Sequence, residues 1–161
     1  MDDEERNGVM RRKDKEITEF EKIVEIAEKC DCITLGINDG KVPYVVPVSF
    51  GTEVENGKLV LYFHGAMQGK KYELLEKNPD VFVTGNFCAG YRETERGGIS
   101  CKYESFMAQG TVERIFDEKA QRALDLLTEH CGFAARPCPD KVLPITAVYR
   151  LVCENLTGKK D

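Results

Sequence analysis

The spacing of apolar residues along the chain changes from a helical to an extended period near residue 31. Within residues 16–29, apolar side chains recur every three or four positions with charged residues between them, which predicts an amphipathic helix over Glu16–Lys29. Residues 31–37 and 42–50 are instead rich in β-branched and aromatic side chains. Asn38-Asp39-Gly40 separates these two runs and is a strong turn signal, so the pattern predicts a β-hairpin.

Further extended segments follow the hairpin. They are predicted at 59–63, 81–88, 103–116 and 145–151, with a turn at residues 55–57 and a polar loop over 89–102. Gly110 is expected to kink or bulge the long strand in which it stands. Six short strands with few helices predict a mainly β protein, an antiparallel barrel that is closed or partly open, with its helices on the outside.

Two more helices interrupt the strands. Lys70–Lys77 predicts a short helix that ends before Pro79, because the residue preceding a proline disfavours the helical conformation. Asp117–His130 predicts a longer helix with Asp117 as its N-cap and Gly132 just beyond its end.

Length and charge narrow the class of protein. A chain of 161 residues predicts one domain over 1–161, with the charge-rich residues 1–15 as a loose N-terminal arm. The net charge of −5 argues against nucleic acid as a partner, because phosphate backbones are bound by clustered positive charge. No apolar run approaches the ~20 residues that cross a bilayer, and the N-terminus is charged, so we expect a cytoplasmic protein without membrane contact.

The seven cysteines do not predict a disulfide framework. Their number is odd, no C-x-x-C occurs, and the two histidines, His64 and His130, stand far apart in the sequence. We therefore expect reduced thiols that pack as small hydrophobic side chains, and no metal site.

The segment most suggestive of chemistry runs from Tyr62 to Lys71, where a strand ends in a glycine-containing turn and a helix begins with two lysines. Free amides and the positive end of a helix dipole attract an anion, and Lys70 and Lys71 add positive charge. Neither a Walker loop nor a G-x-G-x-x-G sequence occurs, which favours a single phosphate over a pyrophosphate. On spacing alone, solvated lysines at a helix start explain the pattern equally well.

His64 stands at the predicted strand end and allows several roles. It could be a general acid, a metal ligand or an imidazole that hydrogen-bonds a cofactor, although pattern alone favours a structural imidazole with a satisfied hydrogen bond. Its place at the strand end favours contact with a ligand, and it is the one candidate catalytic residue.

The order of these segments resembles the pyridoxamine 5′-phosphate oxidase-like split-barrel flavoproteins, and most closely their 5-nitroimidazole-resistance subgroup. The resemblance covers nearly the whole chain. It is carried by residues 10–16 (MRRKDKE), 40–50 (GKVPYVVPVSF), 61–66 (LYFHGA), 69–71 (GKK), 103–105 (YES), 118–120 (EKA) and 157–159 (TGK). The chain lacks the arginine-rich C-terminal substrate signature of the oxidase itself, which argues against oxidation of pyridoxamine phosphate.

The resemblance implies a six-stranded antiparallel split β-barrel that binds FMN at the interface of a homodimer, with haem or FAD as alternative cofactors. It implies that Lys70 and Lys71 hold the phosphate and that Ser105 sits where the partner subunit reaches across. The remaining cofactor-binding residues that it implies are Pro47, Val48, Ser49, Phe63, His64 and Ala66.

Two functions remain open from the sequence. One is an FMN-dependent oxidoreductase, a nitroimidazole reductase-like enzyme that reduces small electron-poor acceptors such as nitroaromatics or quinones. The alternative is a non-enzymatic flavin- or haem-binding protein that carries or stores electrons, with His64 or His130 as an axial ligand in the haem case. Fold alone does not separate an enzyme from a binding protein.

Overall fold

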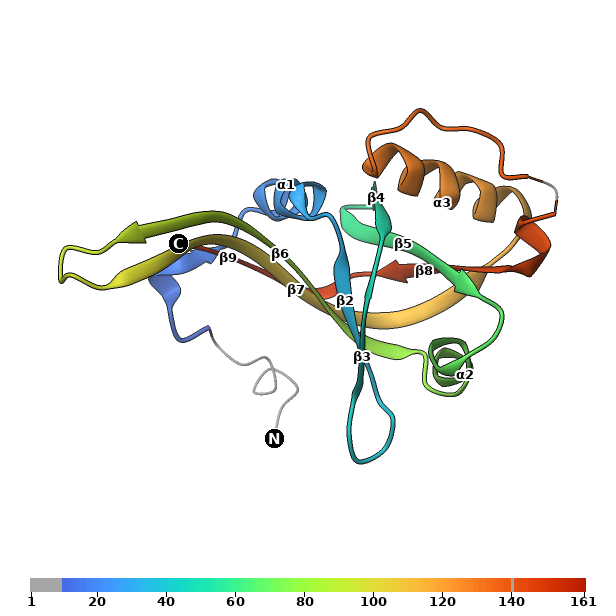
Figure 1. Ribbon diagram of the computed structural model, residues 1–161, viewed down its shortest axis with the longest axis horizontal. Coiled ribbons are helices and arrows are strands. Elements are labelled where there is room, and N and C mark those ends of the chain that lie inside the picture. Colours follow the sequence, from blue (N-terminus) through green and yellow to red (C-terminus); the bar gives the residue numbers. More distant parts are fainter. Residues whose placement is uncertain (1–9, 140) are drawn as a thin grey trace.

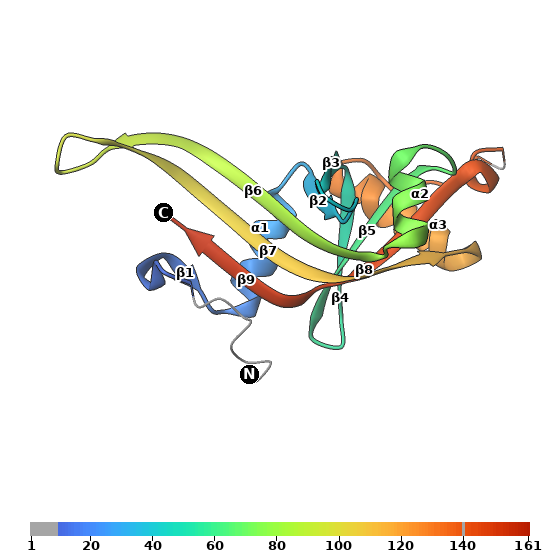
Figure 2. The same ribbon diagram turned by 90° about the horizontal axis from the view of Figure 1, so that it is seen from below.

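The computed structural model describes residues 10–139 and 141–161, which form an antiparallel sheet wrapped into a split barrel with helices on its outside (Figures 1 and 2). The strands of the described residues are β1 (Glu16–Ile17), β2 (Ile33–Ile37), β3 (Tyr44–Val48), β4 (Phe50–Glu55), β5 (Lys58–Ala66), β6 (Asp80–Glu93), β7 (Ile99–Ile115), β8 (Thr146–Val152) and β9 (Glu154–Lys160). The α-helices are α1 (Phe20–Lys29), α2 (Lys70–Lys77) and α3 (Asp117–His130), and short 3-10 turns cover Lys13–Lys15 and Leu143–Ile145.

The strand order explains the barrel. Hydrogen-bonded neighbours run β3-β2-β6-β7-β8-β5-β4, and β9 lies between β7 and β1. The two ends of this path, β3 and β4, are consecutive in the chain and are joined at Ser49. The barrel is therefore completed by a bend in the chain and not by a closed hydrogen-bond ladder. The predicted split barrel is confirmed, with nine strands in the described residues where the sequence predicted six.

The long strand β7 divides the sheet into its two halves. Along one edge β7 pairs with β6, and along the other it pairs first with β9 and then, from Val112 to Ile115, with β8. The change of partner occurs around Gly110, where an added Cβ would collide with the carbonyl oxygen of Val152. The register between β7 and β9 shifts between Met107 and Gln109, so the irregularity expected at Gly110 lies next to it.

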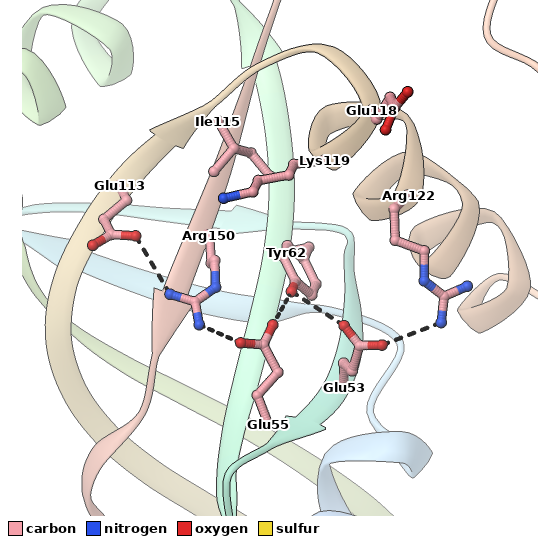
Figure 3. A pocket seen from close by; sticks show the side chains of 9 residues that line it. All are labelled: Glu53, Glu55, Tyr62, Glu113, Ile115, Glu118, Lys119, Arg122 and Arg150. Atoms are coloured by element: carbon pink, nitrogen blue, oxygen red, sulfur yellow. Dashed lines mark hydrogen bonds and ion pairs between the residues drawn. The ribbon is translucent and has the colours of Figure 1, made fainter.

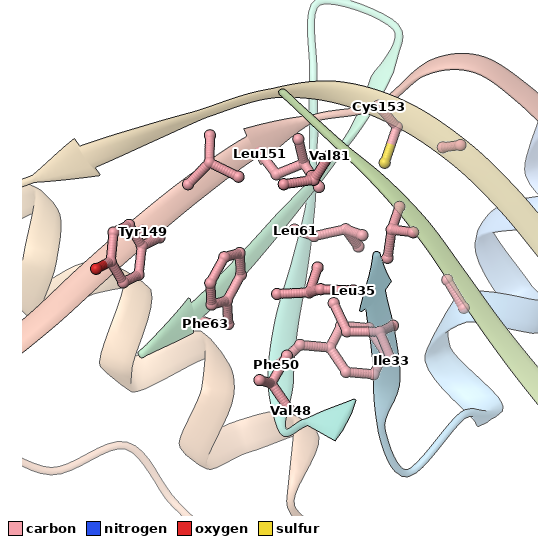
Figure 4. Close-up of a cluster of buried hydrophobic side chains, with 14 of the residues drawn as sticks. Ile33, Leu35, Val48, Phe50, Leu61, Phe63, Val81, Tyr149, Leu151 and Cys153 are labelled. Atoms are coloured by element: carbon pink, nitrogen blue, oxygen red, sulfur yellow. The ribbon is translucent and has the colours of Figure 1, made fainter. Parts of the chain in front are cut away.

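Inward-facing side chains of both halves meet in one core (Figure 4). The rings of Phe63 on β5 and Tyr149 on β8 stack with their centroids 5.1 Å apart. The largest fully buried side chains are Tyr149, Phe50, Phe63, Phe106, Ile33, Leu35, Ile37, Leu59, Leu61, Leu151, Val60 and Val83. Burial of each such side chain contributes about 1.5–3 kcal/mol, so this core is the main source of the fold's stability.

The helices cover different parts of the sheet. α1 lies against β6, β7 and β9, and α3 lies against β4, β5 and β8 (Figure 1). α3 can approach β4 closely because residue 51 is a glycine, whose Cβ would lie 2.6 Å from the backbone carbon of Leu126. α3 ends in a Schellman motif, in which Gly132 has φ 84° and the Phe133 amide donates to Thr128 O at 3.1 Å.

Several predicted boundaries were wrong. The first helix begins at Phe20 because Glu16 and Ile17 instead pair with Lys159 and Gly158 as a short strand. Asp117 is the first helical residue and not the N-cap, which is Phe116, and no side-chain cap bond forms there. At Glu16 and Ile17, pairing with β9 overrides the local helical pattern. At Asp117, the positive φ of 53° prevents its side chain from capping the helix.

The sequence also underestimated the sheet. Residues 154–160, for which no strand was predicted, form β9 between β7 and β1. Most of the predicted loop 89–102 continues β6 and β7 as a protruding hairpin arm, closed by a turn at Thr94–Gly98 (Figure 2). Residues 1–9 of the expected N-terminal arm lie outside the described residues, whereas Lys15 is held by an ion pair with Asp161.

Candidate functional site

β5 ends at Ala66, beyond the predicted strand end at residue 63, and after three intervening residues α2 begins at Lys70, where the sequence predicted a helix. Gly69 is the N-cap and has φ 92°, a left-handed conformation that glycine adopts freely. The amide of Glu73 donates to Gly69 O at 3.1 Å, and the amides before it lie in the first turn, where a helix offers no internal acceptor. Glycine supplies no side chain to cap them, so the start of α2 presents free donors at its positive end.

Lys71 turns back from the helix across the end of β5. Its Nζ donates to the main-chain oxygen of His64 at 3.1 Å, and a Cβ on Gly65 would lie 2.7 Å from this Nζ. Burial lowers the pKa of Lys71 below its usual value. Among the residues that the structure describes, no carboxylate pairs with Lys71, so its partly desolvated charge has no anionic partner among them.

Lys70 has a different environment. Its Nζ forms an ion pair with Asp39, in the turn between β2 and β3, and lies 5.4 Å from the centroid of the Tyr44 ring. The hydrogen bond to Asp39 raises the pKa of Lys70. The two neighbouring lysines therefore differ: Lys70 ties α2 to the β2–β3 hairpin, whereas Lys71 is the cation that remains available.

The other predicted cofactor residues divide into exposed and buried groups. Pro47, Ser49, His64 and Ala66 are exposed, whereas the side chains of Val48 and Phe63 lie in the core. Phe50 pairs with Phe63 across β4 and β5, and extending this register by one residue brings Ser49 level with His64. Core side chains fill the space between residues 45–50 and 61–64, so a planar ring would have to lie outside the barrel.

The imidazole of His64 lies on the face of β5 opposite to Phe63 and Gly65, because successive side chains of a strand alternate. There it lines a cavity of about 400 Å³ between β5, α3 and the segment before β8. The other lining residues are Leu124, Leu127, Thr128, Arg136, Pro137, Cys138, Pro139, Val142 and Thr146. Gln121 of α3 holds this segment in place by accepting from the Cys138 amide at 3.0 Å and donating to Arg136 O at 3.4 Å.

The position of His64 affects its charge. Desolvation by the surrounding protein lowers the pKa of His64, and the nearby Lys71 lowers it further. Both effects disfavour a second positive charge, so the imidazole is neutral at neutral pH. A neutral imidazole keeps one donor and one acceptor nitrogen for a bound molecule.

Ser105 is not brought together with His64 within one chain. It lies on β7, opposite Asn86 of β6 and Lys159 of β9. His130 is also separate, since its Nε2 lies 2.7 Å from Cys30 O and its ring contacts Phe50. In the described part of the chain, no three His, Cys, Asp or Glu side chains gather as a possible metal site.

A larger cavity of about 540 Å³ lies elsewhere, between α3 and the outer faces of β4, β5 and β8 (Figure 3). Most of its charged groups pair with one another. Glu55 accepts from Arg150 and from the Tyr62 hydroxyl, at 2.5 Å each, and Glu53 pairs with Arg122 at 3.2 Å. Arg150 lowers the pKa of Glu55, as expected for a stable ion pair. This network gives a ligand fewer free polar groups than the start of α2 does.

Sequence reasoning missed three parts of the site. Asp39 and Gly65 act only through contacts with Lys70 and Lys71, which the linear sequence does not reveal. The segment that contains Arg136 and Cys138 carried no prediction, and its prolines are the one local signal of an ordered connection there.

The fold and the site together define an antiparallel split barrel in which a helix beginning with two lysines follows the end of one barrel strand. Residues 20–160 match the family model of pyridoxamine 5′-phosphate oxidase, and the chain belongs to this family. No protein of curated function matches it significantly. Among the helices of the described residues, none has the length and apolar character needed to cross a membrane.

Solved structures extend the comparison. A candidate 5-nitroimidazole antibiotic resistance protein from Bacteroides thetaiotaomicron is 31% identical, with a TM-score of 0.76 over 89% of this chain and 85% of that one. A flavocytochrome from Azotobacter vinelandii is 24% identical, with a TM-score of 0.74 over 97% and 73% of the two chains. An FAD- and haem-binding protein from Mycobacterium smegmatis is 22% identical, with a TM-score of 0.76 over 91% and 73%. The last two show the shared fold.

Proposed function

We propose that this protein is an FMN-dependent reductase of small electron-poor acceptors, such as nitroaromatics or quinones, and that it works as a cytoplasmic homodimer. The observation that carries the proposal is Lys71, a partly buried cation beside the free amides of α2 with no carboxylate partner in the described residues. Such a site suits the dianionic phosphate of FMN, which would replace lost solvation with charge-assisted hydrogen bonds.

Other exposed residues near Lys71 are placed to contact the flavin ring. Ser49 and His64 are exposed at neighbouring strand ends, next to the phosphate cradle, so they are the groups that we assign to the flavin ring. The flavin supplies the two-electron chemistry when bound. The protein's part is to orient the flavin ring and to limit the access of water to it. Pro47 and Ala66, also exposed, complete this side of the site. Val48 and Phe63 would contribute through their backbone, because their side chains are buried.

The cavity beside His64 suits the electron acceptor. Its lining is mostly apolar, with leucines and prolines, and His64 and Arg136 add a neutral donor and a cation. An electron-poor ring with a nitro or quinone oxygen would find apolar walls for the ring and donors for the oxygen. The similarity to a candidate 5-nitroimidazole resistance protein supports the same acceptor class.

An exposed face of the sheet supports the homodimer. Val45, Phe82 and Met107 are 59%, 50% and 46% exposed, although each lies within a strand. The register places Val45 and Phe82 on either side of Gly36, and Met107 opposite Thr84, which stands two residues after Phe82. These apolar side chains therefore share one face, to which Ser105 also belongs. Burying such a face against a second copy would stabilise the protein and bring Ser105 toward the partner's site.

The decisive experiment adds FMN, riboflavin, FAD or haem to purified protein and follows absorbance and flavin fluorescence. We expect FMN to bind more tightly than riboflavin, and the bound flavin to be reduced by a nicotinamide donor and reoxidised by a nitroaromatic compound without oxygen. Tight haem binding with no flavin binding would overturn the cofactor assignment. Flavin binding without turnover of any acceptor would favour the electron carrier over the reductase.

A further inference from the structure

Two cysteines on the hairpin arm lie in direct contact. The Sγ atoms of Cys88 on β6 and Cys101 on β7 are 3.1 Å apart, and both residues are free thiols. Cys88 is opposite Tyr103, whereas Tyr91 is opposite Cys101, with a register shift between them. Cys88 and Cys101 therefore lie diagonally on one side of the arm, and the bulge brings their sulfur atoms together.

The other cysteines have different surroundings. Cys30 and Cys153 are buried in the core, and burial raises the pKa of Cys30 to about 11 and that of Cys153 to about 12. Cys32 and Cys131 are exposed. Within residues 10–139 and 141–161, Cys88 and Cys101 form the one pair of cysteine sulfurs in hydrogen-bond contact. This pair thus combines access to solvent with a second thiol at bonding range.

The two thiols of the pair are not equivalent. The hydrogen bond shared with Cys101 lowers the pKa of Cys88, and the same contact raises the pKa of Cys101. Because the thiolate is the nucleophile in disulfide exchange, Cys88 is the first sulfur to react and Cys101 the second.

We propose that Cys88 and Cys101 are a reversible dithiol–disulfide pair that exchanges with low-molecular-weight disulfides. The Cys88 thiolate attacks one sulfur of the small disulfide, which forms a mixed disulfide at Cys88 and releases one small thiolate. Cys101 then loses its proton and attacks the Sγ of Cys88, which forms the Cys88–Cys101 bond and releases the second thiolate. In balance, two protein thiols and one small disulfide give one protein disulfide and two small thiols.

The position of the pair makes the reaction reversible. The arm protrudes from the barrel (Figure 2), and Cys88 is exposed while Cys101 is half-buried beside it, so a small thiol can reach the bond and reduce it again. The exchange uses only the two protein thiols and the small disulfide, so the proposal does not depend on flavin binding.

Full-length protein is incubated without oxygen in glutathione buffers of increasing oxidised fraction, and the reaction is then quenched with acid. Alkylation of the remaining thiols and peptide mass mapping identify the products. We expect both thiols of the pair to be lost together, with a link between the peptides that contain Cys88 and Cys101, and to return on addition of reduced glutathione. The Cys101→Ser variant should retain glutathione on Cys88.

The control is Cys32→Ser, which removes an exposed cysteine outside the pair and should form the same link as the wild type. Two separate glutathione adducts at Cys88 and Cys101, a link between two chains, or thiols unchanged when the buffer is fully oxidised would each overturn the proposal. If a serine variant fails to fold, the peptide map of the wild-type protein still distinguishes these outcomes.

Discussion

Lys71 lies across Gly65 and donates a hydrogen bond to the main-chain oxygen of His64 at 3.1 Å. This contact places the lysine on the inner side of the end of β5, while the imidazole of His64 projects from the other side into the cavity of about 400 Å³. The proposed phosphate cradle and acceptor cavity therefore share one strand end without sharing side chains. Substitutions on the two sides should have separable effects.

Replacing Lys71 with Ala should weaken FMN binding at least tenfold and leave riboflavin binding nearly unchanged. A charge-assisted hydrogen bond contributes about 1.5–3 kcal/mol, and only FMN carries the phosphate. Lys70→Ala should have a smaller effect, because Lys70 already pairs with Asp39. Dissociation constants from flavin fluorescence measure both variants.

Lys77→Ala is the matched control, since it removes a lysine from the far end of the same helix. It should leave the affinity for FMN unchanged. If Lys71→Ala weakens riboflavin as much as FMN, the lysine acts on folding or on the ring and not on the phosphate.

Gly65→Ala should reproduce part of the loss caused by Lys71→Ala. Its Cβ would lie 2.7 Å from the Nζ and 2.8 Å from the Cε of Lys71, so the lysine must move away from His64 O. The displaced atoms are the end of a flexible side chain, so thermal unfolding should change little. In a double-mutant cycle on FMN affinity, Gly65→Ala should have almost no effect once Lys71 is Ala. Additive losses would show that Gly65 acts independently of Lys71.

Placing a charge on the exposed sheet face should shift the homodimer toward the monomer. Phe82→Asp and Met107→Asp put an unpaired carboxylate among apolar side chains that we assign to the interface, where burying it costs several kcal/mol. Val54→Asp is the control, because Val54 is 48% exposed on β4, outside this face. Sedimentation equilibrium at micromolar protein measures the change. A wild-type protein that binds flavin as a monomer would contradict the proposed dimer.

The sequence predicted local structure well wherever neighbouring residues determine it. α2 has the predicted bounds, and the turn at Asn56-Gly57 forms with φ 51° and 75°, as its residues favour. The sequence-based prediction failed where contact with a segment distant in the sequence determines the local conformation. Ile17 fits a helical pattern but instead pairs with Gly158 of β9. β9 itself has few apolar residues, so its strand conformation is determined by pairing with β7 and is not evident from its own sequence.

The candidate site shows the same division. The helix start with its two lysines was visible in the sequence, because glycine and lysine at a strand-to-helix junction have a local physical meaning. The difference between Lys70 and Lys71 was not visible, since it depends on Asp39, some thirty residues earlier, and on the space above Gly65. Likewise, Phe63 is buried because its side chain points to the core face of β5, and the sequence motif 61–66 does not show which face that is.

Replacing His64 with Gln should change how stability and turnover depend on pH. Because desolvation lowers the pKa of His64 in the folded protein, the unfolded chain, with a pKa of about 6.5, binds the proton more readily. The contribution of His64 is then fully present above pH ~6.5 and is lost as the pH falls through the lowered pKa. Gln cannot titrate, so the variant should lose less stability than the wild type between pH 8 and pH 5 in urea denaturation. If His64 also donates the proton to the reduced acceptor, kcat should lose its dependence on pH below neutrality while FMN stays bound. Profiles of stability and kcat that superimpose on those of the wild type after scaling would remove both roles and leave His64 as a structural residue of the strand end.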